Sequence, residues 1–238
     1  MFRCLCLISL GLTACGPPAA APILLFAGSG TSPGDVEAIE SILRENRMAY
    51  ARANSWQLNG MSESQIKAYR LLIVPGGNFV QIGDGLTPGA AANIRTAVQG
   101  GVNYLGICAG AFFGGNSPYN GLNLTAGVRF PFYSAEDRGI RKMAVAIADA
   151  GAGTLDLYWE DGPQLTGWGA AVAKYPDGAP AIVQGTSGNG WVVLSGIHPE
   201  APASWRLGLT FHTPVSASQA YAARLIQSAL NRTPLPHY

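Results

Sequence analysis

The chain has 238 residues, of which 48% are hydrophobic, only 12% are charged, and 31 are glycine. This composition excludes an intrinsically disordered chain, which requires low hydrophobicity and high net charge. The 15 Lys and Arg residues against 14 Asp and Glu leave no basic surface, so nucleic acid is excluded as a partner.

The first 22 residues have the pattern of an export signal followed by a linker. Arg3 supplies one positive charge, and the apolar run 4–14 follows it directly. A membrane-spanning helix needs about 20 apolar residues, so this run is too short to be one. A charge followed by a short apolar stretch is typical of a secretory signal peptide. The alternative, a buried first strand or helix, is disfavoured by the Gly- and Pro-rich residues 16–22.

The sequence Leu12-Thr13-Ala14-Cys15 resembles the lipobox of bacterial lipoproteins. This resemblance implies that residues 1–14 are a lipoprotein signal peptide and that Cys15 becomes an acylated N-terminus, carrying palmitate-type chains, followed by a linker over 15–22. Stable anchoring usually takes more than one acyl chain. The expected partner is therefore a membrane, bound through the lipid on Cys15. The expected location is the bacterial envelope, facing the periplasm, and Gly16 after the cysteine implies the outer membrane.

The four cysteines then have different fates. Cys4 and Cys6 leave with the signal peptide and Cys15 is acylated, so Cys108 is the only free thiol. A single thiol cannot form an intramolecular disulfide, and an unpaired cysteine in an exported protein is a candidate reactive group.

Residues 23–115 alternate between predicted strands and helices. Short apolar runs predict strands at 23–26, 49–53, 71–74 and 102–107. Ser32-Pro33 and Thr87-Pro88 are typical helix starts, and apolar residues at helical spacing follow the first of them. Strand–helix–strand alternation indicates βαβ units, so we expect a doubly wound α/β domain with a mostly parallel sheet.

The second half of the chain predicts an antiparallel meander and a closing helix. Strands are expected at 169–175, 181–184 and 191–197, with turns at 176–178 and 187–190. An Ala-rich amphipathic pattern predicts a helix over 216–230. We find no repeat and no second linker, so residues 23–238 are expected to form one domain.

Gly106-Ile107-Cys108-Ala109-Gly110 has the form Gly-x-nucleophile-x-Gly at a predicted strand-to-helix junction. A sharp turn there exposes the nucleophile, and the flanking glycines remove the clashes that Cβ atoms would cause. The helix N-terminus favours thiolate over thiol. The alternative is an inert buried cysteine, since free cysteine is among the most buried residue types.

His198-Pro199-Glu200 follows the most apolar strand of the second half. A thiolate nucleophile needs an imidazole as its base, and the imidazole needs a third group to orient it. His198 and Glu200 supply both. The alternative is a solvated loop with an ordinary histidine and a surface acid.

Taken together, residues 106–110, His198-Pro199-Glu200 and Pro75-Gly76-Gly77 resemble the class I glutamine amidotransferase-like superfamily, whose fold is flavodoxin-like. The segments 74–77, 106–111 and 158–163 are most similar to the N-terminal domain of biotin–protein ligases. The resemblance implies that Cys108 is the nucleophile, His198 its base and later acid, and Glu200 the orienting group.

The resemblance also implies an oxyanion hole from the backbone N–H of Ala109 and of Gly76 or Gly77, although the two glycines could instead form a plain turn. Tyr158, Glu160 and Asp161 are expected to rim the pocket and bind a small-molecule or peptide-like substrate. Tyr158 could equally belong to the core at a strand end. The acidic residue that redox-sensing relatives carry after the first strand is missing from residues 26–30.

No cofactor and no metal are expected. A single free cysteine and scattered histidines do not give the usual zinc-ligand spacing. Gly28-Ser29-Gly30 lacks the Gly-Lys-Ser/Thr ending of a phosphate-binding loop.

Three functions remain open. The first is a cysteine hydrolase or amidase that cleaves amide or γ-glutamyl-type bonds in the envelope through a thioester. The second is a non-catalytic binding lipoprotein that keeps the fold and the pocket. The third is a glutamine amidotransferase subunit, which the signal peptide and the lack of a synthetase module in this sequence disfavour.

Overall fold

The computed structural model describes residues 21–238. The expected signal peptide, the acylation site Cys15 and the linker up to residue 20 lie outside this range. Within residues 21–238, no helix is both long enough and apolar enough to cross a membrane.

The described chain forms nine strands and seven α-helices. The strands are β1 (Ile23–Phe26), β2 (Tyr50–Ala53), β3 (Leu71–Val74), β4 (Asn103–Ile107), β5 (Lys142–Asp149), β6 (Gly153–Glu160), β7 (Ala170–Lys174), β8 (Pro180–Ser187) and β9 (Gly190–Ser195). The helices are α1 (Pro33–Glu45), α2 (Ser55–Asn59), α3 (Glu63–Ile66), α4 (Phe79–Asp84), α5 (Pro88–Gln99), α6 (Ala109–Gly114) and α7 (Val215–Asn231).

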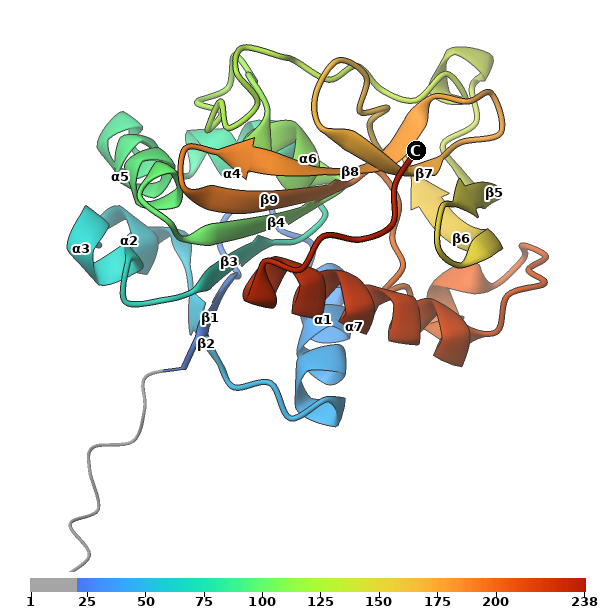
Figure 1. The fold of residues 1–238 in the computed structure, drawn as a ribbon, viewed down its shortest axis with the longest axis horizontal. Helices are drawn as coiled ribbons and strands as arrows, with labels where there is room; N and C mark the ends of the chain where they lie inside the picture. The colour runs from blue at the N-terminus through green and yellow to red at the C-terminus, as the bar shows by residue number, and fades with distance from the viewer. Residues whose placement is uncertain (1–20) are drawn as a thin grey trace, which may run out of the picture.

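All nine strands form one mixed sheet in the order β2-β1-β3-β4-β9-β8-β7-β5-β6. Strands β2 to β9 along this order pair in parallel. From β9 onward every pairing is antiparallel. Strand β9 therefore joins the two halves, with parallel β4 on one side and antiparallel β8 on the other (Figure 1).

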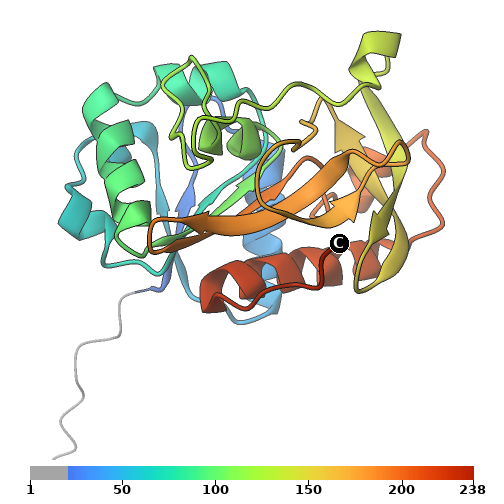
Figure 2. The same cartoon turned by 45° about the horizontal axis from the view of Figure 1, so that its top comes forward.

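Helices cover both faces of the parallel half. α1 and α7 lie on one face, and α4, α5 and α6 lie on the other (Figures 1 and 2). Every residue of β1 and β3 is at most 1% exposed, which explains why these strands are continuous apolar runs rather than alternating ones. Alternate residues of each strand contribute to the two cores, Ile23 and Leu25 to one and Leu24 and Phe26 to the other.

A buried carboxylate ties α7 to the β5–β6 hairpin. Asp149 accepts hydrogen bonds from the Tyr221 hydroxyl at 2.5 Å and from the backbone N–H groups of Gly151 and Ala152 at 2.9 and 2.6 Å. Arg224 forms an ion pair with it at 3.1 Å. The same carboxylate therefore fixes the hairpin turn and the helix.

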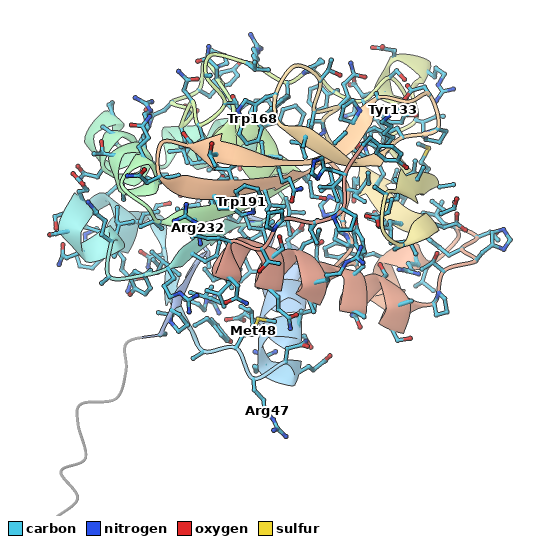
Figure 3. The ribbon with its side chains drawn as sticks, viewed as in Figure 1. Arg47, Met48, Tyr133, Trp168, Trp191 and Arg232 are labelled. Carbon is cyan, nitrogen blue, oxygen red and sulfur yellow. The ribbon has the colours of Figure 1, made fainter. Side chains whose placement is uncertain are left out.

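The far end of the sheet is closed by aromatic packing. Tyr133 stacks on Tyr175 with ring centroids 3.8 Å apart, and it lies where β5 and β7 meet (Figure 3). The Tyr175 hydroxyl donates to the carbonyls of Pro163 and Gly196. These contacts hold the loop after β6 against the loop that follows β9.

The predicted α/β architecture, including the parallel strands, the meander and the closing helix, is confirmed. The sequence analysis did not predict the hairpin β5–β6, so the antiparallel part of the sheet is larger than expected. Much of β5 alternates between buried and exposed residues and includes three alanines, and the first half of β6 is exposed or half-buried, which gives a weak apolar signal. The short helices α2, α3 and α4 were also missed, since each is too short to show helical periodicity.

Candidate functional site

Cys108 occupies a sharp turn between β4 and α6. Its backbone has φ 49° and ψ −106°, a strained conformation for a residue with a Cβ atom. Its N–H donates to the Ser195 carbonyl at 2.7 Å, which fixes the turn against β9. The side chain is buried, and the thiol lies 3.5 Å from the Glu160 carbonyl oxygen, to which it donates.

Gly110 is required because α6 packs directly on the sheet. A Cβ atom at this position would overlap the backbone carbonyl of Val74 in β3. The Tyr104 hydroxyl donates to the Gly110 carbonyl at 2.7 Å and holds the first turn of α6 in place. The glycine two residues after the cysteine thus serves the close helix–sheet contact that the Gly-x-Cys-x-Gly pattern predicts.

His198 reaches the same edge of the sheet from the neighbouring strand. It follows β9, which is parallel to β4, so both strands end beside each other. Its N–H donates to the Tyr158 carbonyl at 2.8 Å. The imidazole is buried, and the Cys108 thiol is close enough to it to raise its pKa. The structure therefore brings the predicted nucleophile and base together.

Two carboxylates, rather than one, contact the imidazole. The Nδ1 atom of His198 lies 2.9 Å from Oε1 of Glu200 and 3.1 Å from Oδ1 of Asp35. Both acids are buried, with exposed fractions of 0% and 5%. Glu200 is the orienting group that the sequence predicts, whereas the sequence analysis did not place Asp35 in the site.

Asp35 comes from the first turn of α1, whose N-terminal cap is Ser32. The sequence analysis found no acid in residues 26–30 after the first strand, and this holds. The acid lies a few residues further along the same connection. Since β1 is parallel to β3 and β3 to β4, the start of α1 points at the edge where β4 and β9 also end.

The electrostatic environment favours a charged imidazole. Burial lowers the pKa of His198, but the Cys108 thiolate, Glu200 and Asp35 outweigh burial and raise its pKa well above 6.5. Burial raises the pKa of Glu200 and neighbouring Asp35 raises it further, while His198 lowers it. The imidazole thus lies beside two buried carboxyl groups and the Cys108 side chain, and these neighbours favour its charged form.

The backbone N–H groups of Gly77 and Ala109 have no hydrogen-bond partner within the described residues, and both residues line one cavity with Cys108. Gly77 has φ 138°, and a Cβ there would overlap the Gly30 carbonyl oxygen. Gly77 forms a β-bridge with Thr31. The hydrogen bonds of this bridge come from flanking residues: the Ser32 N–H donates to the Gly76 carbonyl, and the Asn78 N–H donates to the Gly30 carbonyl. The Gly77 N–H therefore takes no part in them. Ala109 also donates no hydrogen bond within residues 21–238.

Gly76 lies beside Asp35 and His198. A Cβ at Gly76 would collide with Oδ1 of Asp35 and would lie 2.6 Å from Cε1 of His198, so this glycine makes room for the acid–imidazole contact. Of the two glycines predicted for the oxyanion hole, Gly77 lines the cavity that contains Cys108. Both free amides, Gly77 and Ala109, therefore surround that one cavity.

Two cavities open on either side of the Cys108–His198 pair. The base-side cavity, of about 380 Å³, is lined by Asp35, Lys142, Tyr158, Glu160, His198 and Trp205, among others. The nucleophile-side cavity, of about 320 Å³, is lined by Gly77, Phe79, Cys108, Ala109, Phe112, Phe132, Arg141 and Asp161, among others. His198 thus lines a polar cavity, and Cys108 lines a more aromatic one.

The three residues predicted to bind substrate divide between these cavities. Tyr158 and Glu160 line the base-side cavity, where the Tyr158 hydroxyl donates to Glu160 at 2.6 Å. Burial, followed by the hydrogen bond to Glu160, raises the pKa of Tyr158. Asp161 lines the nucleophile-side cavity and forms an ion pair with Arg141 at 2.7 Å. Trp159, between them, is fully buried in the core.

Asp35, His198 and Glu200 also offer three potential metal-ligand atoms within 4.8 Å of one another. The hydrogen bond between His198 Nδ1 and Glu200, and the close charge contact of Asp35 with the same nitrogen, account for this proximity. The chemistry that the geometry supports directly is nucleophilic: a thiol, a charged imidazole with two carboxyl partners, and two free amides.

Comparison with known proteins gives one family match over part of the chain and several solved structures with a similar fold. Residues 21–120 match the family described as biotin-protein ligase, N terminal. This range includes Asp35, Gly77 and Cys108 and ends before His198. No curated protein matches the chain.

Solved structures share the fold at low identity. A glutamine amidotransferase is 19% identical with a TM-score of 0.59, covering 75% of this chain and 90% of its own. A glutamine amidotransferase from Thermotoga maritima is 12% identical with a TM-score of 0.55, covering 88% and 96%. A β-galactosidase from Rahnella sp. R3 is 14% identical with a TM-score of 0.53, covering 90% of this chain but 32% of its own. The fold thus occurs in enzymes with different names, and function must be argued from the site.

Proposed function

We propose that this protein is a cysteine hydrolase of amide or γ-glutamyl-type bonds. The premise is its glutamine amidotransferase-like fold, together with the match of residues 21–120 to the N-terminal region of biotin–protein ligases. The observation that supports this most strongly is the convergence of three elements on one edge of the sheet. The Cys108 thiol, the His198 imidazole and the free amides of Gly77 and Ala109 meet there.

In the proposed reaction, the Cys108 thiolate attacks the substrate carbonyl carbon and forms a C–S bond. The carbonyl oxygen becomes an oxyanion, which accepts hydrogen bonds from the N–H groups of Gly77 and Ala109. Losing one such donor typically costs 10²–10³ in kcat. His198 then gives its proton to the leaving nitrogen, the C–N bond breaks, and an amine and a thioester result.

The thioester is hydrolysed by the reverse use of the same groups. His198, now neutral, takes a proton from water, and the hydroxide attacks the thioester carbon. The C–S bond breaks, releasing a carboxylic acid and regenerating the thiolate–imidazolium pair. Glu200 and Asp35 hold Nδ1 of the imidazole throughout and stabilise its charge, so Nε2 stays directed to the reacting atoms.

The experiment that tests this proposal has two readouts on protein lacking residues 1–15. The first is the rate of Cys108 alkylation by iodoacetamide between pH 4 and 10, in wild type and His198→Ala. The second is the intact mass after exposure to p-nitrophenyl acetate, where a thioester adds one acetyl group. We expect fast alkylation at neutral pH that depends on His198, and an acetyl adduct that is absent from Cys108→Ser.

The outcome that overturns the hydrolase is equally specific. A thiol that alkylates slowly and identically in both proteins, with no acetyl adduct, would favour the binding lipoprotein, which keeps the fold and pocket without chemistry. Alkylation separates the two because it needs only thiolate and access, not a particular substrate.

We also propose that the protein is anchored through a lipid on Cys15 and faces the periplasm. The support is the sequence pattern of residues 1–22. Labelling cells with radioactive palmitate tests it: the label should enter the wild type and be lost in Cys15→Ala. Unlabelled wild-type protein recovered without its first 14 residues would contradict the anchor and leave export by an ordinary signal peptide.

A further inference from the structure

Three aromatic rings form one wall of the cavity that contains the nucleophile. Phe79 stacks on Phe112 at 4.6 Å between centroids, and Phe132 lies 4.9 Å from Phe112 and 6.2 Å from Phe79. The same three rings line a second cavity of about 430 Å³, which continues past them to Pro131. Phe132 is 38% exposed, an unusual position for a ring unless it has a partner to cover it.

The position of the catalytic groups decides which part of a substrate enters this cavity. His198 must protonate the leaving nitrogen, and His198 lines the base-side cavity. The amides that hold the oxyanion, Gly77 and Ala109, line the nucleophile-side cavity together with Cys108. A substrate carbonyl held in this way directs its leaving group toward His198 and its acyl substituent toward the rings.

The charges around the rings do not suit a glutamine-like acyl group with its free amino and carboxyl ends. Arg141, the cation that lines this cavity, already pairs with Glu136 and Asp161, each at 2.7 Å. Its charge is therefore largely balanced by two acids, and the other cation nearby, Arg129, lines the adjoining cavity beyond the rings rather than the one that contains Cys108. The remaining wall consists largely of phenylalanine rings, which bind apolar groups and pack edge-to-face or stacked on other rings.

We propose that the nucleophile-side cavity is an acyl-group subsite for aromatic or large apolar acyl chains. This inference rests on the proposed function and names its substrate class: amides of arylalkanoic acids or of comparable apolar acids. The phenyl group packs on Phe79, Phe112 and Phe132, the carbonyl oxygen lies against the Gly77 and Ala109 amides, and the amine portion lies in the polar base-side cavity.

Binding is measured first, because it needs no turnover. Cys108→Ala is titrated with 3-phenylpropionamide, acetamide and glutamine, and amide chemical shifts are followed by NMR. We expect 3-phenylpropionamide to bind at least about tenfold more tightly than the other two, because burying a phenyl ring against apolar walls is favourable by at least that factor. Equal binding of the three amides, or preference for glutamine, overturns the subsite.

Two variants locate the binding. Phe132→Ala should abolish the preference for the aromatic amide, and Phe132→Leu should keep part of it, which guards against loss through misfolding. Trp56→Ala is the matched control, since Trp56 is an aromatic residue that is 82% exposed and lines neither cavity. An aromatic preference that survives Phe132→Ala would place the ring elsewhere and overturn the proposal.

Acylation then separates this inference from the hydrolase itself. The wild-type protein is exposed separately to p-nitrophenyl acetate and to p-nitrophenyl 3-phenylpropionate. The rate of thioester formation from each ester is followed by intact mass. A thioester that forms equally fast with both esters keeps the hydrolase and overturns the subsite. Aromatic binding to Cys108→Ala with no thioester from either ester keeps the subsite and overturns the hydrolase.

Discussion

Replacing Asp35 with asparagine removes one of two negative charges from His198 while keeping the size of the side chain. Asp35 is 5% exposed, and its Oδ1 lies 3.1 Å from Nδ1 of the imidazole. This oxygen is buried and has no hydrogen-bond partner within the described chain, so its contact with His198 is one of charge. The contact should therefore act almost wholly on the charge of His198 and, through it, on the Cys108 thiolate.

The magnitude follows from the geometry. An opposite charge within about 4–6 Å typically moves a pKa by about 1–3. Since Glu200 still contacts Nδ1 in the variant, the lower end applies, and about 1.4 kcal/mol corresponds to a factor of ten. We expect Asp35→Asn to slow alkylation of Cys108 by iodoacetamide at pH 7 about tenfold. Loss of the second acid in Asp35→Asn/Glu200→Gln should slow it further.

The same substitution should change stability little, because the lost attraction to the charged imidazole opposes the relieved repulsion between two acids. Asp35 is one of the groups that raise the pKa of buried Glu200, so removing its charge relieves repulsion between two acids. Urea unfolding measures this, with Glu63→Gln as the matched control. Glu63 lies in α3, its side chain is partly exposed, and within the described chain it pairs only with Lys67. If Asp35→Asn alkylates at the wild-type rate while Glu200→Gln does not, the argument for a second acidic partner is wrong.

Three further predictions concern other parts of the molecule. Asp149→Ala should lower the free energy of unfolding in urea by about 3–5 kcal/mol, because it leaves the Tyr221 hydroxyl and Arg224 without their buried partner; wild-type stability would contradict this. Gly110→Ala should give little soluble folded protein, since its Cβ would overlap the Val74 carbonyl, and well-dispersed NMR spectra would argue against that packing. The raised pKa of His198 stabilises the fold fully below pH 6.5 and progressively less as the pH rises through the raised value, so urea unfolding at pH 6 and 9 should show a loss that His198→Gln lacks.

The parallel half of the fold was predictable because its strands carry strong local signals. The β1 and β3 runs are apolar throughout, and the helix between β1 and β2 begins with Ser32-Pro33. Burial on both faces produces that continuous pattern. Strands β5 and β6 lie at the outer edge of the antiparallel half, and neither is a continuous apolar run. Their position depends on the pairing of β5 with β7 and of β6 with β5, which no local pattern records.

The same contrast applies to the site. Cys108 and His198-Pro199-Glu200 follow strands directly, so their residue types and the strand ends point to one edge of the sheet. Asp35 carries an ordinary local explanation, an acid in the first turn of a helix, and that explanation hides its contact with His198. The wall formed by Phe79, Phe112 and Phe132 was likewise missed, because its members come from α4, α6 and the loop before β5.

The strained backbone at Cys108 has a consequence for the evolution and engineering of this protein. An L-residue at φ 49° and ψ −106° costs on the order of 1–3 kcal/mol, whereas glycine adopts positive φ readily. A chain that no longer needed its thiol would therefore gain conformational stability by replacing Cys108 with glycine. Selection for heat resistance alone would be expected to remove the nucleophile, so stability and reactivity oppose each other at this one residue.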